Sequence, residues 1–262
     1  MVNQDLGRKS LLDEIRERGA VRIAVVWGDT SMQYLDPDTG EPAGFVALVG
    51  KLLARDLGVR AEFVELPWVE QVPAIVDGRV DISVKHTNSP PRGFKVEFIA
   101  HSIVCEEGRY VIRRDRGLHN EADLNQPGRI IGVVDGSSQA LHGREYPPPV
   151  QVRILPTKED VFQAVVTGEI DACIHDTGVP NFLLAHPECT VLTGEDGQPA
   201  VAYVDCVHPC IKPGDQRFLN WLNNWTAFWK AGGTFVRLLG QADREHEAKL
   251  ERILAKAGRP GQ

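Results

Sequence analysis

Residues Asp81 to Phe98 read DISVKHTNSPPRGFKVEF, and this stretch decides the fold. A short apolar strand is expected to run into Thr87, after which Ser89 as N-cap and Pro90 at the first position open a helical turn. Arg92 then lies at a helix start, where backbone N–H groups favour an anion and its guanidinium offers a bidentate grip on a carboxylate. The alternative is a solvated arginine, which the helix dipole mildly disfavours at this end.

Length and composition limit the class of protein. The chain has 262 residues, a formal net charge of -7 and 42% hydrophobic residues, enough for one large domain or two lobes with cores of their own. The acidic balance argues against a nucleic-acid partner, because such proteins normally carry a basic stripe. No apolar run approaches the length needed to span a bilayer.

The beginning of the chain has no signal-peptide pattern. MVNQDLGRKSLLDEIRERG passes straight into a charged helix without the apolar segment that a signal peptide needs. Two alternatives stay open: a leader was removed and a start Met added, or the protein stays in the cytoplasm.

Strand-like and helix-like segments alternate along the chain, which predicts an α/β fold with mostly parallel strands. The expected strands are 21–26, 61–65, 80–84, 129–134, 150–155 and 170–175. The expected helices are 44–57, 68–76, 158–167 and 179–186, with short turns after 89 and 138. Segments 102–113 and 200–211 are longer and β-prone. The aromatic residues from Phe218 to Trp229 recur at helical spacing, which predicts a core-facing stripe.

Several segments match the pattern of one family, in that family's order. Thr87 to Phe98 resembles "T-x-T-P-E-R … V-D-F", Gly136-Ser137-Ser138 resembles "G-T-T/S", and Gly168 to Asp176 resembles "G-x-V-D-A-x-x-x-D". The chain thereby resembles the polar amino-acid solute-binding proteins (bacterial extracellular solute-binding protein family 3), the receptors that feed ABC transporters. The resemblance covers most of the chain, including the closing helix and its glycine turn.

The resemblance implies a two-lobed, type II periplasmic-binding-protein-like fold. Each lobe is expected to be an open, mostly parallel sheet with helices on both faces, and the long segments 102–113 and 200–211 are expected to be hinge strands that join the lobes. Lobe 1 is then discontinuous, comprising 1–107 and 205–262, and lobe 2 comprises 108–204.

The same resemblance implies the roles of the site residues. Arg92 and Thr87 would hold the ligand's carboxylate, Asp176 would accept its α-ammonium, and the turn at Ser137 and Ser138 would meet the carboxylate from the other lobe. Capping alternatives stay open, because Asp176 suits the N-cap of the next helix and the serines suit that of theirs.

The expected walls of the site depart from the family pattern. Trp68 would form one wall, with Trp27, Asp29 and Met32 in the loop after the first strand opposite it, although the family's "P-P-F-S-Y" is replaced at Thr30 to Tyr34. A buried core position is the alternative for each tryptophan.

Lys85 is the clearest departure. It lies where relatives have a small residue, and the strand is one residue shorter than usual, which alternatively brings His86 into that position. A cation beside Arg92 would suit an acidic or dicarboxylate ligand; a solvated lysine is the other interpretation.

The leading functional prediction is a receptor that closes by hinge motion over an amino acid or amino-acid-like carboxylate and delivers it to an ABC importer. The expected partners are the small molecule and the permease; we expect no cofactor, no metal site and a monomer. By resemblance the protein is expected to be periplasmic or extracytoplasmic. A ligand-sensing domain is an alternative.

An enzyme on the same fold is the other alternative, because the resemblance extends to cyclohexadienyl dehydratases. Those carry a catalytic acid one helical turn beyond the residue that matches Asp176, where this chain has Val179. A carboxyl group cannot be supplied from there, and nothing in the sequence assigns the role to Glu65, Glu106 or Asp29.

The five cysteines are predicted to be buried or idle thiols. An odd count leaves at least one thiol free, and Cys206 and Cys210 are too far apart on one strand to bridge easily. Their spacing does not fit a zinc site. Reduced cysteines favour the cytoplasm, against the family resemblance.

Overall fold

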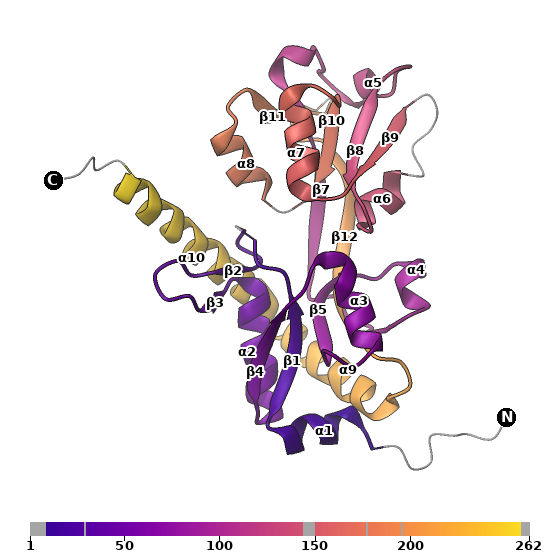
Figure 1. Cartoon of the computed structure of the whole chain (residues 1–262), viewed down its shortest axis with the longest axis vertical. Coiled ribbons are helices and arrows are strands. Elements are labelled where there is room, and N and C mark those ends of the chain that lie inside the picture. Colours follow the sequence, from indigo (N-terminus) through magenta and orange to yellow (C-terminus); the bar gives the residue numbers. More distant parts are fainter. Residues whose placement is uncertain (1–8, 29, 144–149, 177, 195, 258–262) are drawn as a thin grey trace. The chain divides into compact units, whose positions relative to one another are not determined.

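The structure is a computed structural model, and it describes residues 9–28, 30–143, 150–176, 178–194 and 196–257. The chain divides into two compact units (Figure 1). Unit 1 comprises Met1–Val104 and Cys206–Gln262, and unit 2 comprises Cys105–Asp205. The two boundaries fall within the two longest strands, β7 (Val104–Arg113) and β12 (Val201–Ile211).

Unit 1 is an α/β unit built on parallel strands. Besides the end of β12, its described elements are α1 (Leu11–Arg18), β1 (Ala20–Val25), β2 (Tyr34–Leu35), β3 (Pro42–Ala43), α2 (Phe45–Leu57), β4 (Arg60–Glu65), α3 (Trp68–Val76), β5 (Ile82–Thr87), α4 (Pro90–Gly93), β6 (Glu97–Phe98), α9 (Gln216–Ala231) and α10 (Thr234–Ala257). The strand order is β4-β1-β5-β12. β4 and β5 are parallel to β1, and β12 is antiparallel to β5.

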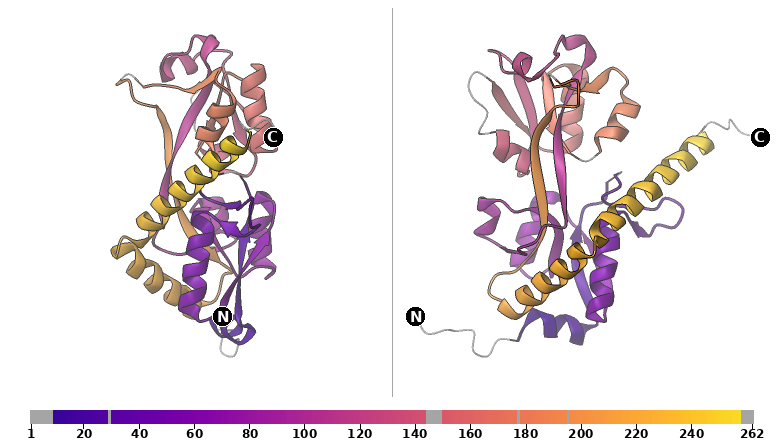
Figure 2. Two further views of the ribbon diagram at one scale, coloured as in Figure 1. Left: turned by 90° about the vertical axis from the view of Figure 1, so that its left-hand side faces the viewer. Right: turned by 180° about the vertical axis from the view of Figure 1, so that it is seen from behind.

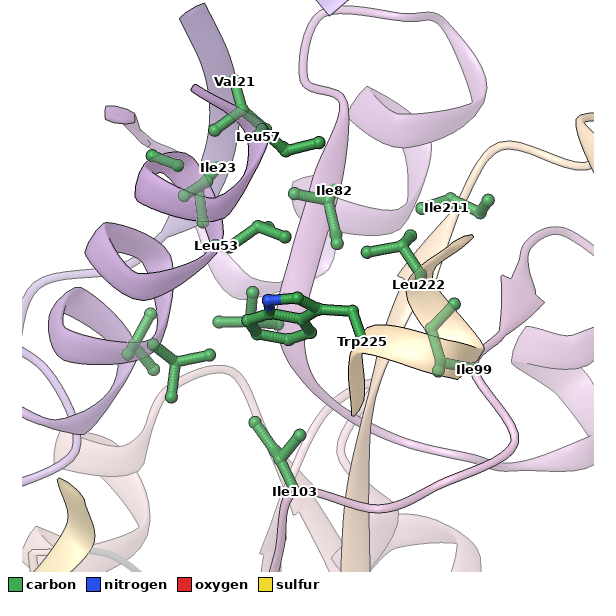
Figure 3. Close-up of a cluster of buried hydrophobic side chains, with 14 of the residues drawn as sticks. Val21, Ile23, Leu53, Leu57, Ile82, Ile99, Ile103, Ile211, Leu222 and Trp225 are labelled. Atoms are coloured by element: carbon green, nitrogen blue, oxygen red, sulfur yellow. The ribbon is translucent and has the colours of Figure 1, made fainter. Parts of the chain in front are cut away.

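Helices cover both faces of the unit 1 sheet, which explains why β1 reads as a continuous apolar run. Val21 and Ile23 pack with residues of α2 and α9 in the largest buried cluster, which Figure 3 shows around Trp225. Ala24 lies in a separate cluster with residues of α3. The predicted core-facing stripe is confirmed in α9, where Phe218 is fully buried.

Unit 2 repeats this α/β plan. Its elements besides β7 and the start of β12 are a short 3-10 turn (Arg114–Arg116), α5 (Glu121–Leu124), β8 (Ile130–Val134), α6 (Ser138–Gly143), β9 (Gln151–Leu155), α7 (Lys158–Thr167), β10 (Ala172–His175), α8 (Val179–Ala185) and β11 (Cys189–Val191). β8 is parallel to β9 and β10, and β7 is antiparallel to β10. Ile131 and Cys173 belong to buried clusters on opposite faces of this sheet.

Each unit contains the same turn between a helix and a central strand. α3 and α7 are each followed by a glycine with a left-handed backbone, Gly78 with φ 76° and Gly168 with φ 74°. One residue further on, a backbone N–H donates over 2.9 Å to a helix carbonyl, that of Ala74 in unit 1 and Ala164 in unit 2. Side chains other than glycine are strained at such a φ, so the glycine sets where the chain leaves the helix.

An aspartate follows the turn and joins two strands in unit 1. Asp81, 1% exposed, accepts hydrogen bonds from the backbone N–H of Arg22 in β1 (2.7 Å) and from the Arg22 Nη2 (2.7 Å). Arg18 at the end of α1 donates to the same carboxylate. Two half-buried guanidinium groups therefore compensate the burial of one carboxylate.

Unit 2 carries the equivalent arrangement. Asp171, 8% exposed, accepts from the backbone N–H of Ile130 in β8 (2.9 Å) and from Arg129 Nη1 (2.8 Å). In both units, a buried aspartate thus fixes the start of the central strand against its parallel neighbour.

The predicted helices and strands are confirmed to within a few residues. The strand expected to run into Thr87 is β5, which continues beyond the apolar segment 80–84 through the polar residues Lys85-His86-Thr87. β12 pairs with this end of β5, Val207 opposite Thr87 and His208 opposite His86. Strand pairing from a distant segment therefore overrides the polar composition.

The prediction of five idle thiols is wrong for two cysteines. Cys105 and Cys206 are disulfide-bonded, whereas Cys173, Cys189 and Cys210 are buried free thiols. The disulfide involves residues of β7 and β12, which are far apart in sequence, so local spacing held no signal for it. Burial raises the pKa of Cys210 to about 12, consistent with an inert thiol.

Replacement of Asp81 tests the aspartate at the start of β5. Asp81→Ala leaves two arginines and one backbone N–H without their buried acceptor, and we expect the free energy of unfolding to fall by about 3–5 kcal/mol. Urea denaturation followed by circular dichroism measures it. Asp77→Ala, at a nearby side chain that is 62% exposed, is the matched control and should cost little. Equal losses in both variants would contradict the role given to Asp81.

Candidate functional site

Three strand ends of unit 1 share one edge of its sheet. β4, β1 and β5 are parallel, so their carboxyl ends lie on the same side. Trp68 follows β4 and Trp27 follows β1. Thr87 is the last residue of β5, and Arg92 lies in the helical turn after it. The topology therefore brings most of the predicted unit 1 residues to one edge.

Arg92 lies at the centre of this group. It is half-buried, its Nη1 donates to the Thr87 carbonyl oxygen over 3.2 Å, and its Cζ lies 5.7 Å from the centroid of the Trp68 ring. The Trp68 ring in turn contacts the His86 imidazole, with centroids 4.4 Å apart. Thr87, Arg92, Trp68 and His86 thus form one contiguous cluster, in which cation–π contact and a backbone acceptor orient the guanidinium.

The turn that carries Arg92 differs from its prediction in one bond. Ser89 does occupy the N-cap position of α4, and its carbonyl accepts from the Arg92 and Gly93 N–H groups. Its side chain makes no capping hydrogen bond, and the buried Oγ has no partner within the described residues. Backbone bonds and Pro90 at the start of the turn therefore define α4 without the side-chain cap.

His86 is the unusual member of the cluster. It is 1% exposed, and neither ring nitrogen has a hydrogen-bond partner in the described part of the chain. Burial, and then the positive charges of Arg92 and Lys85, hold the pKa of His86 well below its ordinary value. The imidazole is therefore neutral in the folded protein at neutral pH.

Lys85 and the residues after β1 complete unit 1. Lys85 is half-buried and near enough to His86 to act on its charge state. Trp27 is half-buried and packs edge-on against Phe63, with centroids 6.1 Å apart, whereas Met32 is 4% exposed and belongs to the main hydrophobic cluster. Asp29 lies outside the described residues.

Unit 2 brings its predicted residues to one sheet edge in the same way. β8 and β10 are parallel, and the turn with Ser137 and Ser138 follows β8 while Asp176 follows β10. Ser137 Oγ donates to the Val134 carbonyl oxygen (2.5 Å) and accepts from the Ala140 N–H (3.2 Å). The Ser137 hydroxyl therefore caps the start of α6, which is the alternative to a role in ligand binding.

Asp176 is held by side chains that sequence reasoning missed. Gln139 Nε2 donates to Asp176 Oδ2 over 3.2 Å, and the Tyr203 hydroxyl lies 3.5 Å from the same oxygen. His175 Nδ1 lies 3.4 Å from Oδ1, outside hydrogen-bond geometry. The N-cap of α8 is Gly178, not Asp176. Gln139 directly follows the two serines, and that adjacency was the available signal.

A second layer of polar contacts supports Tyr203. The His142 ring stacks on it with centroids 4.6 Å apart, and His142 Nε2 lies 3.0 Å from Asp205 Oδ1. Burial, with Asp176 and Asp205 nearby, raises the pKa of Tyr203, so the phenol stays protonated. Tyr203 lies directly over Gly108, where a Cβ would come within 2.2 Å of the ring. Any larger residue at Gly108 would displace this support.

The two units differ in charge at these edges. Unit 1 offers the cations Arg92 and Lys85, a setting suited to a carboxylate, and unit 2 offers the carboxylate of Asp176, suited to an ammonium group. Within the described residues, no three His, Cys, Asp or Glu side chains are grouped to hold a metal ion, and no described helix is long and apolar enough to cross a membrane.

Comparison with known proteins identifies similar chains. The family model described as "Bacterial extracellular solute-binding proteins, family 3" matches residues 21–241. The ABC transporter arginine-binding protein 1 of Escherichia coli is 24% identical over 77% of this chain and 82% of its own length. The glutamate-binding protein GluB of Corynebacterium glutamicum is 24% identical over 94% and 84%.

A solved structure supports the fold. The ancestral amino acid-binding protein AncCDT-1, titled a precursor of cyclohexadienyl dehydratase, is 28% identical and superimposes with a TM-score of 0.73, covering 89% of this chain and 99% of its own. The α/β plan of this chain is therefore the plan of that protein.

The buried His86 makes acid stability a test of its environment. Its pKa is lowered from 6.5 in the folded state, so below about pH 6.5 only the unfolded chain takes up the proton. Stability is fully present above that pH and falls by about 1.4 kcal/mol per pH unit as the pH drops towards the lowered folded pKa.

Urea denaturation between pH 7.5 and 4.5 measures this dependence. We expect the slope of the free energy of unfolding against pH to be smaller in His86→Leu by about 1.4 kcal/mol per pH unit, the contribution of one proton. His101→Gln, at an exposed histidine of the same unit, should leave the slope unchanged. Identical slopes in His86→Leu and the unaltered protein would show that the imidazole is charged in the fold.

Proposed function

The chain belongs to the bacterial extracellular solute-binding proteins, family 3, with the type II periplasmic-binding-protein fold, and on that premise we propose that it is a receptor for an amino acid or amino-acid-like carboxylate. The observation that carries the proposal is the cluster of Arg92, Thr87 and Trp68 at the carboxyl edge of the unit 1 sheet. Such an edge is where open α/β sheets bind ligands.

In this proposal unit 1 binds the carboxylate end of the ligand. The Thr87 carbonyl and the Trp68 ring already hold the Arg92 guanidinium, so little conformational freedom is lost when it pairs with a carboxylate. Lys85 adds a second positive charge, which favours a ligand with a further acidic group. The neutral His86 adds no charge of its own.

Unit 2 binds the ammonium end. Asp176 is accessible to charge-assisted hydrogen bonding at one edge of its unit, and Gln139 and Tyr203 orient its carboxylate. Ser137 and Ser138 contribute mainly backbone N–H groups, because the Ser137 hydroxyl is used within the turn.

Ligand binding drives closure of the two units in this mechanism. β7 and β12 contain the boundaries between the two compact units, and in this proposal they act as the hinge strands between the lobes. A ligand that contacts Arg92 and Asp176 together favours the closed form by its differential affinity. The closed receptor, a monomer, then docks on an ABC importer permease.

The proposed compartment is extracytoplasmic. Cys105 and Cys206 are disulfide-bonded, and disulfides persist in oxidising compartments such as the periplasm or the cell exterior. This reverses the argument that reduced cysteines favour the cytoplasm, and it agrees with the family's extracellular description.

A dehydratase-like enzyme is the second candidate, because AncCDT-1 is titled a precursor of cyclohexadienyl dehydratase. Against it, Val179 is 5% exposed and packs in a hydrophobic cluster of unit 2. An aliphatic side chain in a core can neither donate nor accept a proton. The curated relatives compared above are named as binding proteins, so we propose a non-enzymatic receptor.

A thermal-shift screen tests the receptor and its anchor together. The probes are the common L-amino acids, dicarboxylates, opines and prephenate, since a compound that binds only the folded state raises the melting temperature. We expect one amino acid or related carboxylate to give a clear shift. In calorimetry, Arg92→Ala should weaken the binding of that compound by about 30-fold to 1,000-fold. Lys95→Ala, which removes an exposed cation in the same region, should leave the affinity unchanged.

The same screen separates the alternatives. No shift with any compound would refute the amino-acid receptor, and a shift with prephenate that fades with time would favour the enzyme. Equal affinity for L-glutamate and L-glutamine, unaltered by Lys85→Met, would refute the preference for an acidic ligand.

Thiol counting tests the compartment argument. We expect three alkylatable thiols in the denatured, unreduced protein isolated from its natural host, and five after reduction, because Cys105 and Cys206 are disulfide-bonded. Mass spectrometry after iodoacetamide treatment gives both numbers. Five thiols without reduction would contradict an oxidising location.

A further inference from the structure

The C-terminal helix extends beyond the part of the chain that matches the family. The match ends at residue 241, whereas α10 runs from Thr234 to Ala257. Figure 2 shows α10, in yellow, as one uninterrupted helix that passes α2 and the β2–β3 hairpin of unit 1. Residues 242–257 therefore form an extension of α10 beyond the family match.

The inward face of the extension is polar, which packing alone does not explain. Phe235 and Ala242 are buried on the first turns, as expected for a helix on a core. Further along the same side, His246 is 6% exposed and Lys249 is 5% exposed. Lysine is rarely buried unless its charge is compensated, so this face points to a specific contact.

One contact of this face is with Tyr34, the first residue of β2. Tyr34 is 3% exposed, the His246 ring lies edge-on to it with centroids 5.2 Å apart, and Lys249 Nζ lies 4.8 Å from the centroid of its ring. An ammonium group over a desolvated aromatic face is a strong form of the cation–π interaction. Two side chains of α10 therefore hold one tyrosine of the hairpin.

One helical turn later, α10 reaches the tip of the same hairpin. Arg252 lies 3.4 Å from Asp36 Oδ2 and 3.6 Å from Asp38 Oδ2. His246, Lys249 and Arg252 are spaced three apart and so lie along one side of the helix. Exposed ion pairs contribute little alone, so the argument depends mainly on the contacts of His246 and Lys249 with Tyr34.

Tyr34 is directly continuous with the loop that follows β1. The Gly28 N–H donates to the Gln33 carbonyl (3.2 Å), and the Val46 N–H donates to the Met32 carbonyl (2.8 Å). Tyr34 also pairs with Ala43 across the hairpin. Holding Tyr34 therefore limits the movement of Gly28 and of residues 30–43.

We propose that His246, Lys249 and Arg252 are positioning residues that hold this loop in its ligand-binding conformation through Tyr34. The inference rests on the proposed function, because the loop begins directly after Trp27 and follows a strand whose carboxyl end shares the edge with Thr87 and Arg92. A preformed loop binds more tightly, because less disorder is lost when the ligand arrives.

Amide hydrogen exchange on the full chain tests the positioning. Lys249→Met keeps the length and packing of the side chain and removes its charge. We expect exchange in the segment from Gln33 to Ala43 to become faster by on the order of tenfold, with α2 and β4 unchanged. Lys249→Arg, which retains the cation over the ring, should restore slow exchange, and Arg244→Met, at an exposed cation of α10, should not alter it.

Calorimetry with L-arginine, L-glutamine and L-glutamate gives the second measurement. Any of them that binds the unaltered protein should bind Lys249→Met about tenfold more weakly and Lys249→Arg normally. Unaltered loop exchange in Lys249→Met, or faster exchange with unaltered affinity, would overturn the inference. If none of the three binds the unaltered protein but other screened compounds do, those compounds replace them; if nothing binds, the proposed function fails while loop exchange still decides whether α10 holds the hairpin.

Discussion

A buried aspartate at the start of a central strand is the constraint on which both units depend. Asp81 joins β5 to β1 through the Arg22 backbone, and Asp171 joins β10 to β8 through the Ile130 backbone. Each aspartate follows a turn in which a glycine adopts the left-handed backbone conformation that other residues rarely adopt. Because the start of the strand is fixed, its other end is fixed too, and there each unit carries its candidate ligand residues: Thr87 at the end of β5, and Asp176 directly after β10.

The two strand ends are then differentiated by charge. In unit 1, burial and then the positive charges of Arg92 and Lys85 lower the pKa of His86, so among these described residues the positive charge comes from Arg92 and Lys85. In unit 2, Gln139 and Tyr203 both approach one oxygen of Asp176. Under the proposed function, an amino acid would offer a carboxylate to the first edge and an ammonium group to the second, whereas a simple anion or cation would match only one of them.

The sequence predicted what depends on local patterns and missed what depends on distant contacts. The helices 68–76 and 158–167 were predicted at their observed limits, because apolar periodicity and capping act within a few residues. Short motifs predicted Arg92, Thr87 and Trp68 as ligand residues, and the fold brings these three into contact. The pairing of the polar end of β5 with β12, the contact of His86 with Trp68 and the disulfide bonding of Cys105 and Cys206 all depend on residues that are distant in sequence. Gln139 was overlooked although it adjoins Ser138, because its role depends on Asp176 in another strand.

The loop after β1 shows why a distant helix can matter to a ligand site. β4 and β5 lead within a few residues into α3 and α4, whose own backbone bonds order the connections. β1 instead leads into a longer segment whose described strands, β2 and β3, are two residues each, and two strands that short are not stable alone. The buried Tyr34 needs a cover, and His246 and Lys249 provide it from the far end of the chain. A polar cover has a consequence that an apolar one lacks: the cation–π contact is directional, so it holds the ring in one orientation as well as keeping it from water.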